Sequence, residues 1–213
     1  AGLPSFCRQG LASVATVVLN LAAGPYGDSA IAAMSIVSRF MMFINSAIIG
    51  FGQGFQPVCG FNFGARRYDR VLEAFWFCVK VAVITLTIFG AAAFLFSRPI
   101  ITSFRREDMQ VIEIGTLALQ LQVLTLPLQA WITMANMLSQ SIGYGFRASL
   151  VAMGRQGLFL IPALLILPPR SGIFGVQIAQ PAADALTFLL AAVVVSGILR
   201  ELKQMEKQET ENH

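Results

Sequence analysis

Asp184 is the only acidic residue that lies well inside one of the long apolar stretches of this sequence. Placing a carboxylate inside a membrane costs about 2.5–3.5 kcal/mol on insertion scales, so such a residue needs a partner or has a function. Two interpretations follow. Asp184 relays a proton or another cation, or it forms a static ion pair with a base. The static pair is the preferred interpretation, because a base is predicted at the same depth.

Arg39 is the predicted partner of Asp184. Arg39 lies about nine residues into the apolar run that begins near Ala30, and Asp184 lies about eleven residues into the run that begins near Ile173. At a rise of ~1.5 Å per residue, the two side chains are about 13 Å and 16 Å deep. Both runs enter from the same predicted side, and opposite charges at one depth neutralise each other. The sequence therefore predicts an intramembrane ion pair between Arg39 and Asp184.

Neutral polar side chains form a second group of candidates. They recur every three or four residues in the run 3–23, which places them on one helix face, and they follow the whole run 111–136. Such groups either join helices through hydrogen bonds worth about 0.6 kcal/mol each, or line an aqueous cavity that binds a drug-like cation. The set on 111–136 favours a cavity, because it exceeds what packing needs. The cavity candidates are Gln9, Asn20, Asn45, Gln53, Gln56, Gln120, Gln129 and Asn136.

The stretch 50–65 combines glycine, proline and amide residues. Its glycines at every second position, 50 to 54, leave room for another helix to approach closely. Pro57 removes a backbone donor, which predicts a helix end near Val58. The amides beside it need partners or water, so this helix end is predicted to face something other than lipid. The residues of this helix-end motif are Gly54, Pro57, Gly60, Asn62 and Gly64.

The composition indicates how these residues are positioned. The chain is 56% hydrophobic and only 12% charged, and apolar runs of membrane-spanning length repeat along it. We therefore predict an all-α integral membrane protein, a bundle of six transmembrane helices over residues 1–200, with a polar cytoplasmic tail over 201–213. Pro127 is predicted to kink the fourth span. The six runs are approximately 3–23, 30–58, 71–96, 111–136, 148–167 and 173–200.

Several function classes are disfavoured by what the spans lack. The only histidine is His213, and the three cysteines are isolated, so no metal site or histidine relay is predicted. An intramembrane protease needs a histidine base or paired acids, and the spans offer neither, so we do not expect an enzyme or a bound cofactor. The net charge of +4 is modest and lies in loops and at the C-terminal end. It favours contact with lipid headgroups over binding to nucleic acid.

The helix-end motif also carries a family resemblance. With the stretches 2–9 and 32–39, it resembles the MATE (multidrug and toxic compound extrusion) family, in which a Gln-Gly-x-x-Pro-x-x-Gly-x-Asn-x-Gly-Ala run ends the second helix of a six-helix lobe. The similarity covers roughly residues 2–200 and is greatest to the bacterial DinF-like or multi-antimicrobial extrusion branch. The matching residues are Gln53, Gly54, Pro57, Gly60, Asn62, Gly64 and Ala65.

This resemblance implies a function. The chain would be the C-terminal lobe of a twelve-helix secondary transporter that exports organic cations or amphiphiles in exchange for protons or sodium ions by alternating access. Its partners would be an N-terminal six-helix lobe, the bilayer and small-molecule substrates. The first span contains no acid, so the coupling acid is expected in the N-terminal lobe. The alternative is a lipid or oligosaccharide flippase of the same superfamily, for which Arg8, Arg39 and Arg155 are the candidate contacts.

The distribution of basic residues predicts the orientation. With six spans, both ends of the chain lie on one side, and ten of the 15 Lys and Arg residues fall on that side. Because basic residues accumulate in cytoplasmic loops, both ends are predicted to be cytoplasmic in the plasma (inner) membrane. The resemblance implies the same orientation.

This orientation predicts the labelling of single cysteines. A cysteine placed at Ser103 is expected to react with an impermeant thiol reagent added outside intact cells, because its loop is predicted to lie outside. A cysteine placed at Tyr68 is expected to stay unlabelled until the cells are opened. The opposite pattern would show that the orientation is inverted.

Overall fold

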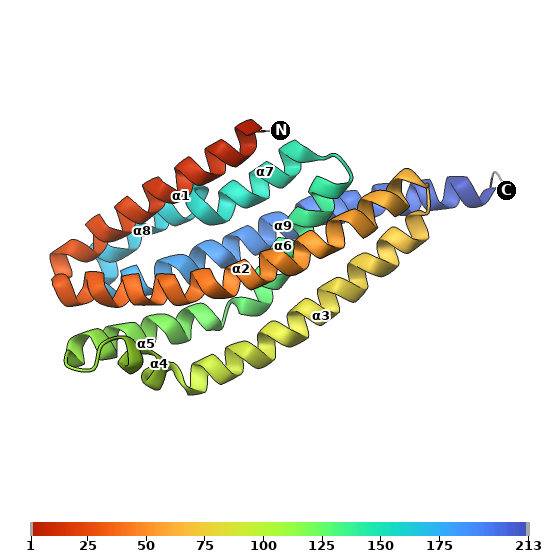
Figure 1. The fold of residues 1–213 in the computed structure, drawn as a ribbon. Helices are drawn as coiled ribbons and strands as arrows, with labels where there is room; N and C mark the ends of the chain where they lie inside the picture. The colour runs from red at the N-terminus through yellow and green to blue at the C-terminus, as the bar shows by residue number, and fades with distance from the viewer. Residues whose placement is uncertain (1, 212–213) are drawn as a thin grey trace.

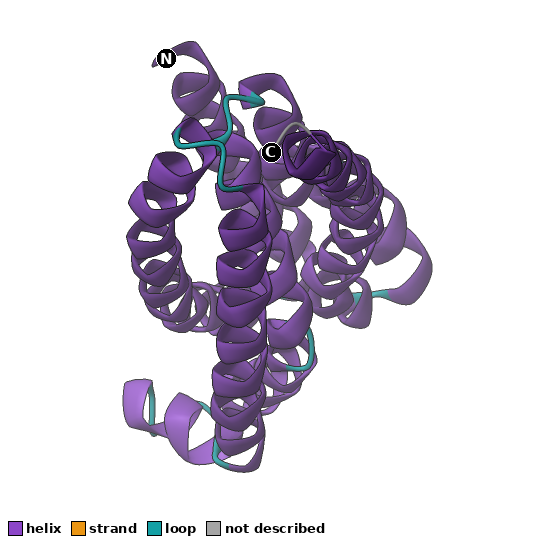
Figure 2. Cartoon of the chain, turned by 90° about the vertical axis from the view of Figure 1, so that its right-hand side faces the viewer, coloured by secondary structure: helices purple, strands orange, loops and turns teal. Residues whose placement is uncertain are grey.

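The computed structural model describes residues 2–211, and within them it leaves the side chains of residues 2–5, 7 and 8 undescribed. Over this range the chain forms long helices that lie side by side, with the short α4 at one end (Figures 1 and 2). The elements are α1 (Gly2–Ala23), η1 (Gly24–Tyr26), α2 (Asp28–Gly64), α3 (Tyr68–Leu95), α4 (Ser97–Phe104), α5 (Met109–Val123), α6 (Leu126–Ser141), α7 (Gly145–Met153), η2 (Gly154–Leu158), α8 (Leu160–Ser171) and α9 (Ile173–Glu211).

Four helical segments of the described chain are long and apolar enough to cross a membrane. They are α2, α3, the segment α7–η2–α8 and α9, and the pair α5–α6 adds a fifth if it is one span. These five correspond to the second to sixth predicted spans. The predicted first span coincides with α1, a helix of 22 residues that is not one of the five. The all-α, multi-pass membrane architecture expected from the sequence is therefore confirmed.

The fourth span is bent where the sequence predicted a kink. Helices α5 and α6 meet at an angle of 50° across Leu124 and Thr125. Pro127 lies in the first turn of α6, where a missing backbone N–H breaks no helical hydrogen bond. A bend in the fourth span is thus confirmed, and it lies at Leu124 and Thr125, just before Pro127.

The fifth span is interrupted by the π-helical segment η2, which the sequence did not predict. Pro162 follows four residues after Leu158 and cannot donate a hydrogen bond to its carbonyl group. Gly157 lies directly against Leu11 of α1, and a side chain at this position would overlap the leucine. The irregular turn is therefore placed where proline removes a helical bond and glycine admits a neighbouring helix.

The predicted end of the second span is wrong. Helix α2 continues through Pro57 and ends at Gly64, so Pro57 lies inside a helix of 37 residues. A single missing hydrogen bond did not stop this helix, since the bonds on either side of it remain. The helix ends instead at Ala65 and Arg66, and Arg66 has a φ of 58°.

Within this lobe, the close approach predicted for the glycines 50 to 54 is found at Gly52 and not at Gly54. Gly54 is exposed, and a Cβ atom built there would have no atom within 4 Å. The close contact lies two residues earlier, because a Cβ at Gly52 would be 2.8 Å from Cγ of Met137 on α6. Three glycines at every second position point in different directions on a helix, so only one of them faces the neighbour.

The last helix continues into the segment that the sequence assigned to a polar tail. Helix α9 runs unbroken to Glu211, so no structural boundary lies at residue 200 (Figure 1). Leu202 is buried, and Glu201 accepts hydrogen bonds from Tyr144 and Arg147. The start of the extension is thereby held against the bundle.

Gly175 gives a test of the packing between α8 and α9. A Cβ at this position would lie 2.5 Å from the carbonyl carbon and oxygen of Leu167, and backbone atoms cannot move aside as a side chain can. Gly175→Ala is therefore expected to lower the free energy of unfolding by about 1–3 kcal/mol.

The matched control is Gly197→Ala in the same helix, where a Cβ would meet nothing within 4 Å. It is expected to leave stability unchanged or raise it by up to ~1 kcal/mol, because glycine weakens a helix interior. Thermal unfolding of the purified protein measures both variants. Equal tolerance of the two alanines would contradict the close crossing.

Candidate functional site

The carboxylate of Asp184 on α9 is the centre of the candidate site. Its side chain is fully buried. Oδ1 accepts hydrogen bonds from Nε of Arg155 at 2.9 Å and from Nε2 of Gln180 at 3.2 Å. Oδ2 accepts from Oγ1 of Thr125 at 3.0 Å and from Nε2 of Gln129 at 2.9 Å. Four donors from three parts of the chain thus surround one carboxylate.

The predicted partner of Asp184 is wrong, although the prediction of an ion pair is right. Asp184 pairs with Arg155 of η2, whereas Arg39 is exposed and forms no ion pair with the described residues. The residue that α2 contributes is Asn45, whose Oδ1 accepts a hydrogen bond from Nη2 of Arg155 at 3.2 Å. The depth estimate for Arg39 was insufficient because depth does not specify which face of a helix a side chain occupies.

The site links the two interrupted helices. Thr125 lies at the bend between α5 and α6, and Gln129 lies one turn into α6. Arg155 lies within η2, the interruption between α7 and α8. Discontinuous transmembrane helices are the elements from which secondary transporters build their ion and substrate sites. In this chain, the carboxylate of Asp184 connects both interrupted spans to α9.

The electrostatics of the site favour a permanent ion pair. The guanidinium group of Arg155 bonds the Asp184 carboxylate directly, so the two opposite charges compensate each other in a buried place. Removing one partner of such a pair leaves an uncompensated buried charge, which typically costs about 3–5 kcal/mol. The static interpretation of Asp184 is therefore the one that this geometry supports.

The hydrogen-bonding needs of two polar atoms of the site are not fully met. The hydroxyl of Thr125 lies within bonding distance of both Asp184 and the carbonyl of Gln122, at 2.8 Å, and its one proton serves only one of them at a time. Oε1 of Gln129 is buried and accepts no hydrogen bond from the described residues. The site can therefore accept one further donor beside the carboxylate.

The predicted cavity residues do not come together in one place. Asn45 and Gln129 belong to the Asp184 site. Gln120 donates to Oγ of Ser97 at 3.0 Å and so joins α5 to α4. Asn45 and Gln129 thus share one site, whereas Gln120 contacts a different neighbour, so within this lobe the three do not line one common surface.

A second group of predicted residues connects helices at the other end of the α6 helix. Gln56 of α2 donates to Oε1 of Gln140 at 3.2 Å, and Gln140 donates to Asn136. Asn136 in turn donates to the carbonyl of Ala148 on α7. This chain of amides joins α2, α6 and α7. For Gln56 and Asn136 the structure therefore supports the hydrogen-bonding interpretation rather than the cavity.

The remaining candidates are exposed in this chain. Gln9 and Asn20 lie on the exposed surface of α1, and Gln53 lies on that of α2. In the helix-end motif, Asn62 donates to the carbonyl of Val58 at 2.8 Å within its own helix. The side chains of Gln9, Asn20 and Gln53 are therefore accessible to another protein domain or molecule.

Sequence reasoning missed Arg155 as the partner of Asp184. Arg155 is the only charged residue in the run 148–167 and has glycines at positions 154 and 157. A lone base between glycines, ahead of Pro162, is a signal for an interrupted helix with a functional side chain. Among the described residues, no group of three or more His, Cys, Asp or Glu side chains comes together as metal ligands.

These features define a multi-pass α-helical membrane protein with two interrupted spans held by a buried ion pair. The model of the MatE family matches residues 4–166, which is more than half of the chain. The chain belongs to the MatE family.

Two relatives allow the length of this chain to be compared with that of other proteins. It is 28% identical over 220 residues to the multidrug export protein MepA of Staphylococcus aureus strain N315, covering 98% of this chain and 45% of the relative. It is 26% identical over 204 residues to MepA of Staphylococcus haemolyticus strain JCSC1435, covering 94% and 44%. The chain thus spans about half the length of these relatives.

Solved structures share the fold. A MOP superfamily transporter from Pyrococcus furiosus matches with a TM-score of 0.86 at 22% identity, covering 95% of this chain and 46% of that chain. The Vibrio cholerae MATE transporter VcmN in its bent form matches with a TM-score of 0.86 at 18% identity, covering 95% and 46%. The described helices therefore have the arrangement of one half of a MATE transporter.

The ion pair predicts the effect of single and double substitutions. Arg155→Gln is expected to lower the free energy of unfolding by about 3–5 kcal/mol, because the Asp184 carboxylate would remain buried without its cation. Arg155→Gln combined with Asp184→Asn is expected to recover most of this loss, since no charge then remains.

The control is Arg39→Gln, which removes an exposed guanidinium group and is expected to leave stability unchanged. Thermal unfolding in detergent compares the variants. A large loss in Arg39→Gln, or no recovery in the double variant, would contradict the assignment of the pair.

Proposed function

We propose that this chain is one lobe of a secondary active multidrug efflux transporter. The observation that carries this proposal is the alignment of nearly the whole chain with about half of proteins named multidrug export protein. The two interrupted helices joined through Asp184 support it, because transporters of this type build their sites on such helices. The proposed substrates are organic cations or amphiphiles.

The proposed partner is an N-terminal lobe of six helices. Alternating access needs two bundles that rock against each other around a central cleft. The exposed polar residues Gln9, Asn20 and Gln53 support this partner, because polar groups in a membrane need a protein or water to contact. In the complete transporter these side chains are proposed to face the cleft, where they would donate and accept hydrogen bonds with substrate.

The proposed driving reaction is the inward movement of a proton or a sodium ion. Asp184 is the one acid of this lobe that lies deep in a span, and Arg155 neutralises it. We therefore assign Asp184 the role of holding the interrupted helices in place, and we propose that the coupling acid belongs to the N-terminal lobe. Both ends of the chain are proposed to be cytoplasmic, in the plasma (inner) membrane.

Transport explains the site better than the alternatives. No enzymatic chemistry is proposed, since the buried carboxylate is occupied by four donors and has no second acid beside it in the described chain. A flippase for an anionic lipid-linked substrate would use unpaired arginines in the cleft. Arg155 is neutralised by Asp184, which weakens that alternative.

The test is a measurement of ethidium efflux from proteoliposomes under an imposed proton or sodium gradient. The chain together with the N-terminal half of a MepA relative, supplied as a second polypeptide, is expected to extrude ethidium. The chain alone is expected to extrude none, because a single lobe lacks the cleft.

Cross-linking of the chain-alone sample reports its oligomeric state in the same experiment. Efflux by the monomeric chain alone would contradict the two-lobe proposal. Failure of the assembled pair to move ethidium or any other cationic dye, with both halves folded and associated, would contradict the proposed function.

A further inference from the structure

Three exposed arginines gather around the short helix α4. Arg98 lies on α4, and Arg105 and Arg106 follow its last residue. The ion pairs found in residues 2–211 involve other arginines, so none of these three is paired with a described carboxylate. The α4 end of the bundle therefore presents three guanidinium groups that form no direct ion pair with the described residues.

The acids of the adjoining loop do not supply the missing partners. Oδ1 of Asp108 accepts from the backbone N–H groups of Gln110 and Val111 at 3.1 and 3.3 Å, which caps α5, and Oδ2 accepts from the hydroxyl of Ser29 at 3.0 Å. These bonds, that of Ser29 first, hold the pKa of Asp108 below its usual value. Glu107 is exposed and is the one acid of this loop without such bonds.

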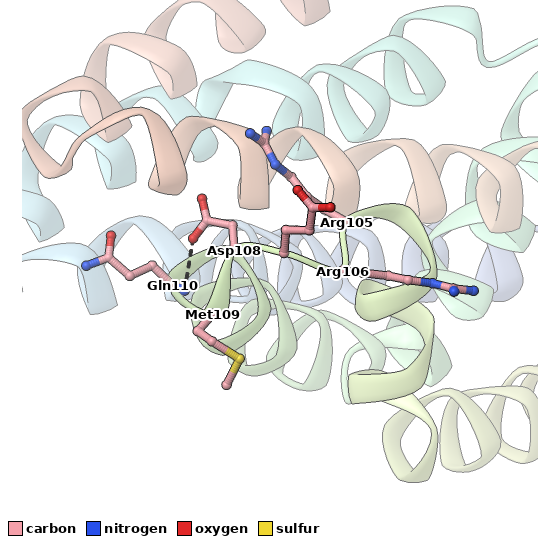
Figure 3. A pocket seen from close by; sticks show the side chains of 6 residues that line it. Arg105, Arg106, Asp108, Met109 and Gln110 are labelled. Carbon is pink, nitrogen blue, oxygen red and sulfur yellow. Dashed lines mark hydrogen bonds between the residues drawn. The ribbon is translucent and has the colours of Figure 1, made fainter.

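The three arginines border two adjoining hollows. One, of about 630 Å³, is lined by residues 105–110, and the other, of about 460 Å³, is lined by residues 98, 99, 102, 103 and 106. Arg106 lines both. Figure 3 shows Arg106 extending away from Asp108, while Arg105 points to the other side of the loop. The guanidinium groups of Arg105 and Arg106 therefore point in different directions over the surface at this end of the bundle.

Apolar side chains flank this basic patch. Leu95, Phe96, Phe104 and Met109 are exposed by 76%, 61%, 55% and 55%. Guanidinium groups beside exposed aromatic and aliphatic side chains are typical of elements that lie at the boundary between lipid headgroups and acyl chains.

The segment that carries the basic patch is packed against α5 and bonded to α2. Ile101 of α4 is buried, and a Cβ at Gly115 of α5 would lie 3.0 Å from its Cγ2 atom. The hydrogen bond from Ser29 to Asp108 joins the same loop to the first turn of α2. A ligand held by the arginines would thus contact a surface that is already ordered by α2 and α5.

We propose that Arg98, Arg105 and Arg106 bind the phosphate headgroup of an anionic phospholipid in the leaflet where α4 lies. The planar guanidinium group donates two parallel hydrogen bonds to phosphate oxygens, and its positive charge is opposite to that of an anionic headgroup. The exposed side chains beside them would contact its acyl chains. This apolar flank assigns the site to a lipid rather than to free phosphate.

The experiment uses a photoreactive phosphatidylglycerol with the full chain in phosphatidylcholine nanodiscs. Label is expected in the peptide that contains residues 95–110, and unlabelled phosphatidylglycerol is expected to compete it away. Excess inorganic phosphate is expected not to compete. Competition by inorganic phosphate as strong as that by the lipid, or equal labelling by a photoreactive phosphatidylcholine, would overturn the proposal.

Two matched variants test whether the arginines are responsible. The variant R98Q/R105Q/R106Q is expected to lose the label several-fold, and R98K/R105K/R106K is expected to lose less of it, because an ammonium group keeps the positive charge but not the two parallel hydrogen bonds. The variant R66Q/R67Q/R70Q removes three arginines at the opposite end and is expected to leave the label on this peptide unchanged. Undiminished labelling of the glutamine variant, or an equal loss in the lysine variant or in the opposite-end variant, would overturn the proposal.

Discussion

The buried charge of Asp184 is the constraint on which the interior of this lobe depends. A carboxylate in a membrane-embedded bundle is costly unless cations and hydrogen-bond donors compensate it. The chain meets this requirement with Arg155, Gln180, Thr125 and Gln129, and two of these donors lie at the places where helices are interrupted. The interruptions and the ion pair therefore support each other, since Thr125 and Arg155 reach the carboxylate from the two interrupted spans.

The same requirement explains the distribution of amide side chains. Polar groups within lipid need partners, because no water is present to bond them. Among the buried amides, Gln129 and Asn136 join helices, whereas Gln9, Asn20 and Gln53 remain on the exposed faces of α1 and α2. The bonds between helices favour movement of the lobe as a rigid body, and the exposed polar groups are left for the cleft in the proposed transporter.

Glycine determines where the helices of this rigid body come closest. Gly52 admits Met137 of α6, and Gly175 lies against the backbone of α8. Side chains at these places would separate the helix pairs and alter the positions of Asn45 and Asp184, which lie on the same two long helices, α2 and α9. Close helix contacts and the geometry of the charged site are therefore linked through rigid elements rather than through loops.

The sequence by itself determined the class of fold, the approximate spans, the bend near Pro127 and the presence of an intramembrane ion pair at Asp184. These follow from local properties: apolar length, the missing N–H of proline and the cost of a buried charge. Only the tertiary structure decided that Arg155 rather than Arg39 is the partner, that Gly52 rather than Gly54 is the close contact, and that Gln56 and Asn136 join helices. Each of these depends on which face of a helix meets which neighbour. Successive side chains of a helix point about 100° apart, so the face that a residue occupies depends on where the helix is regular and where it is not. Here it depends on the π-helical turn of η2 and on the continuation of α2 through Pro57. Apolar patterning alone specifies neither feature.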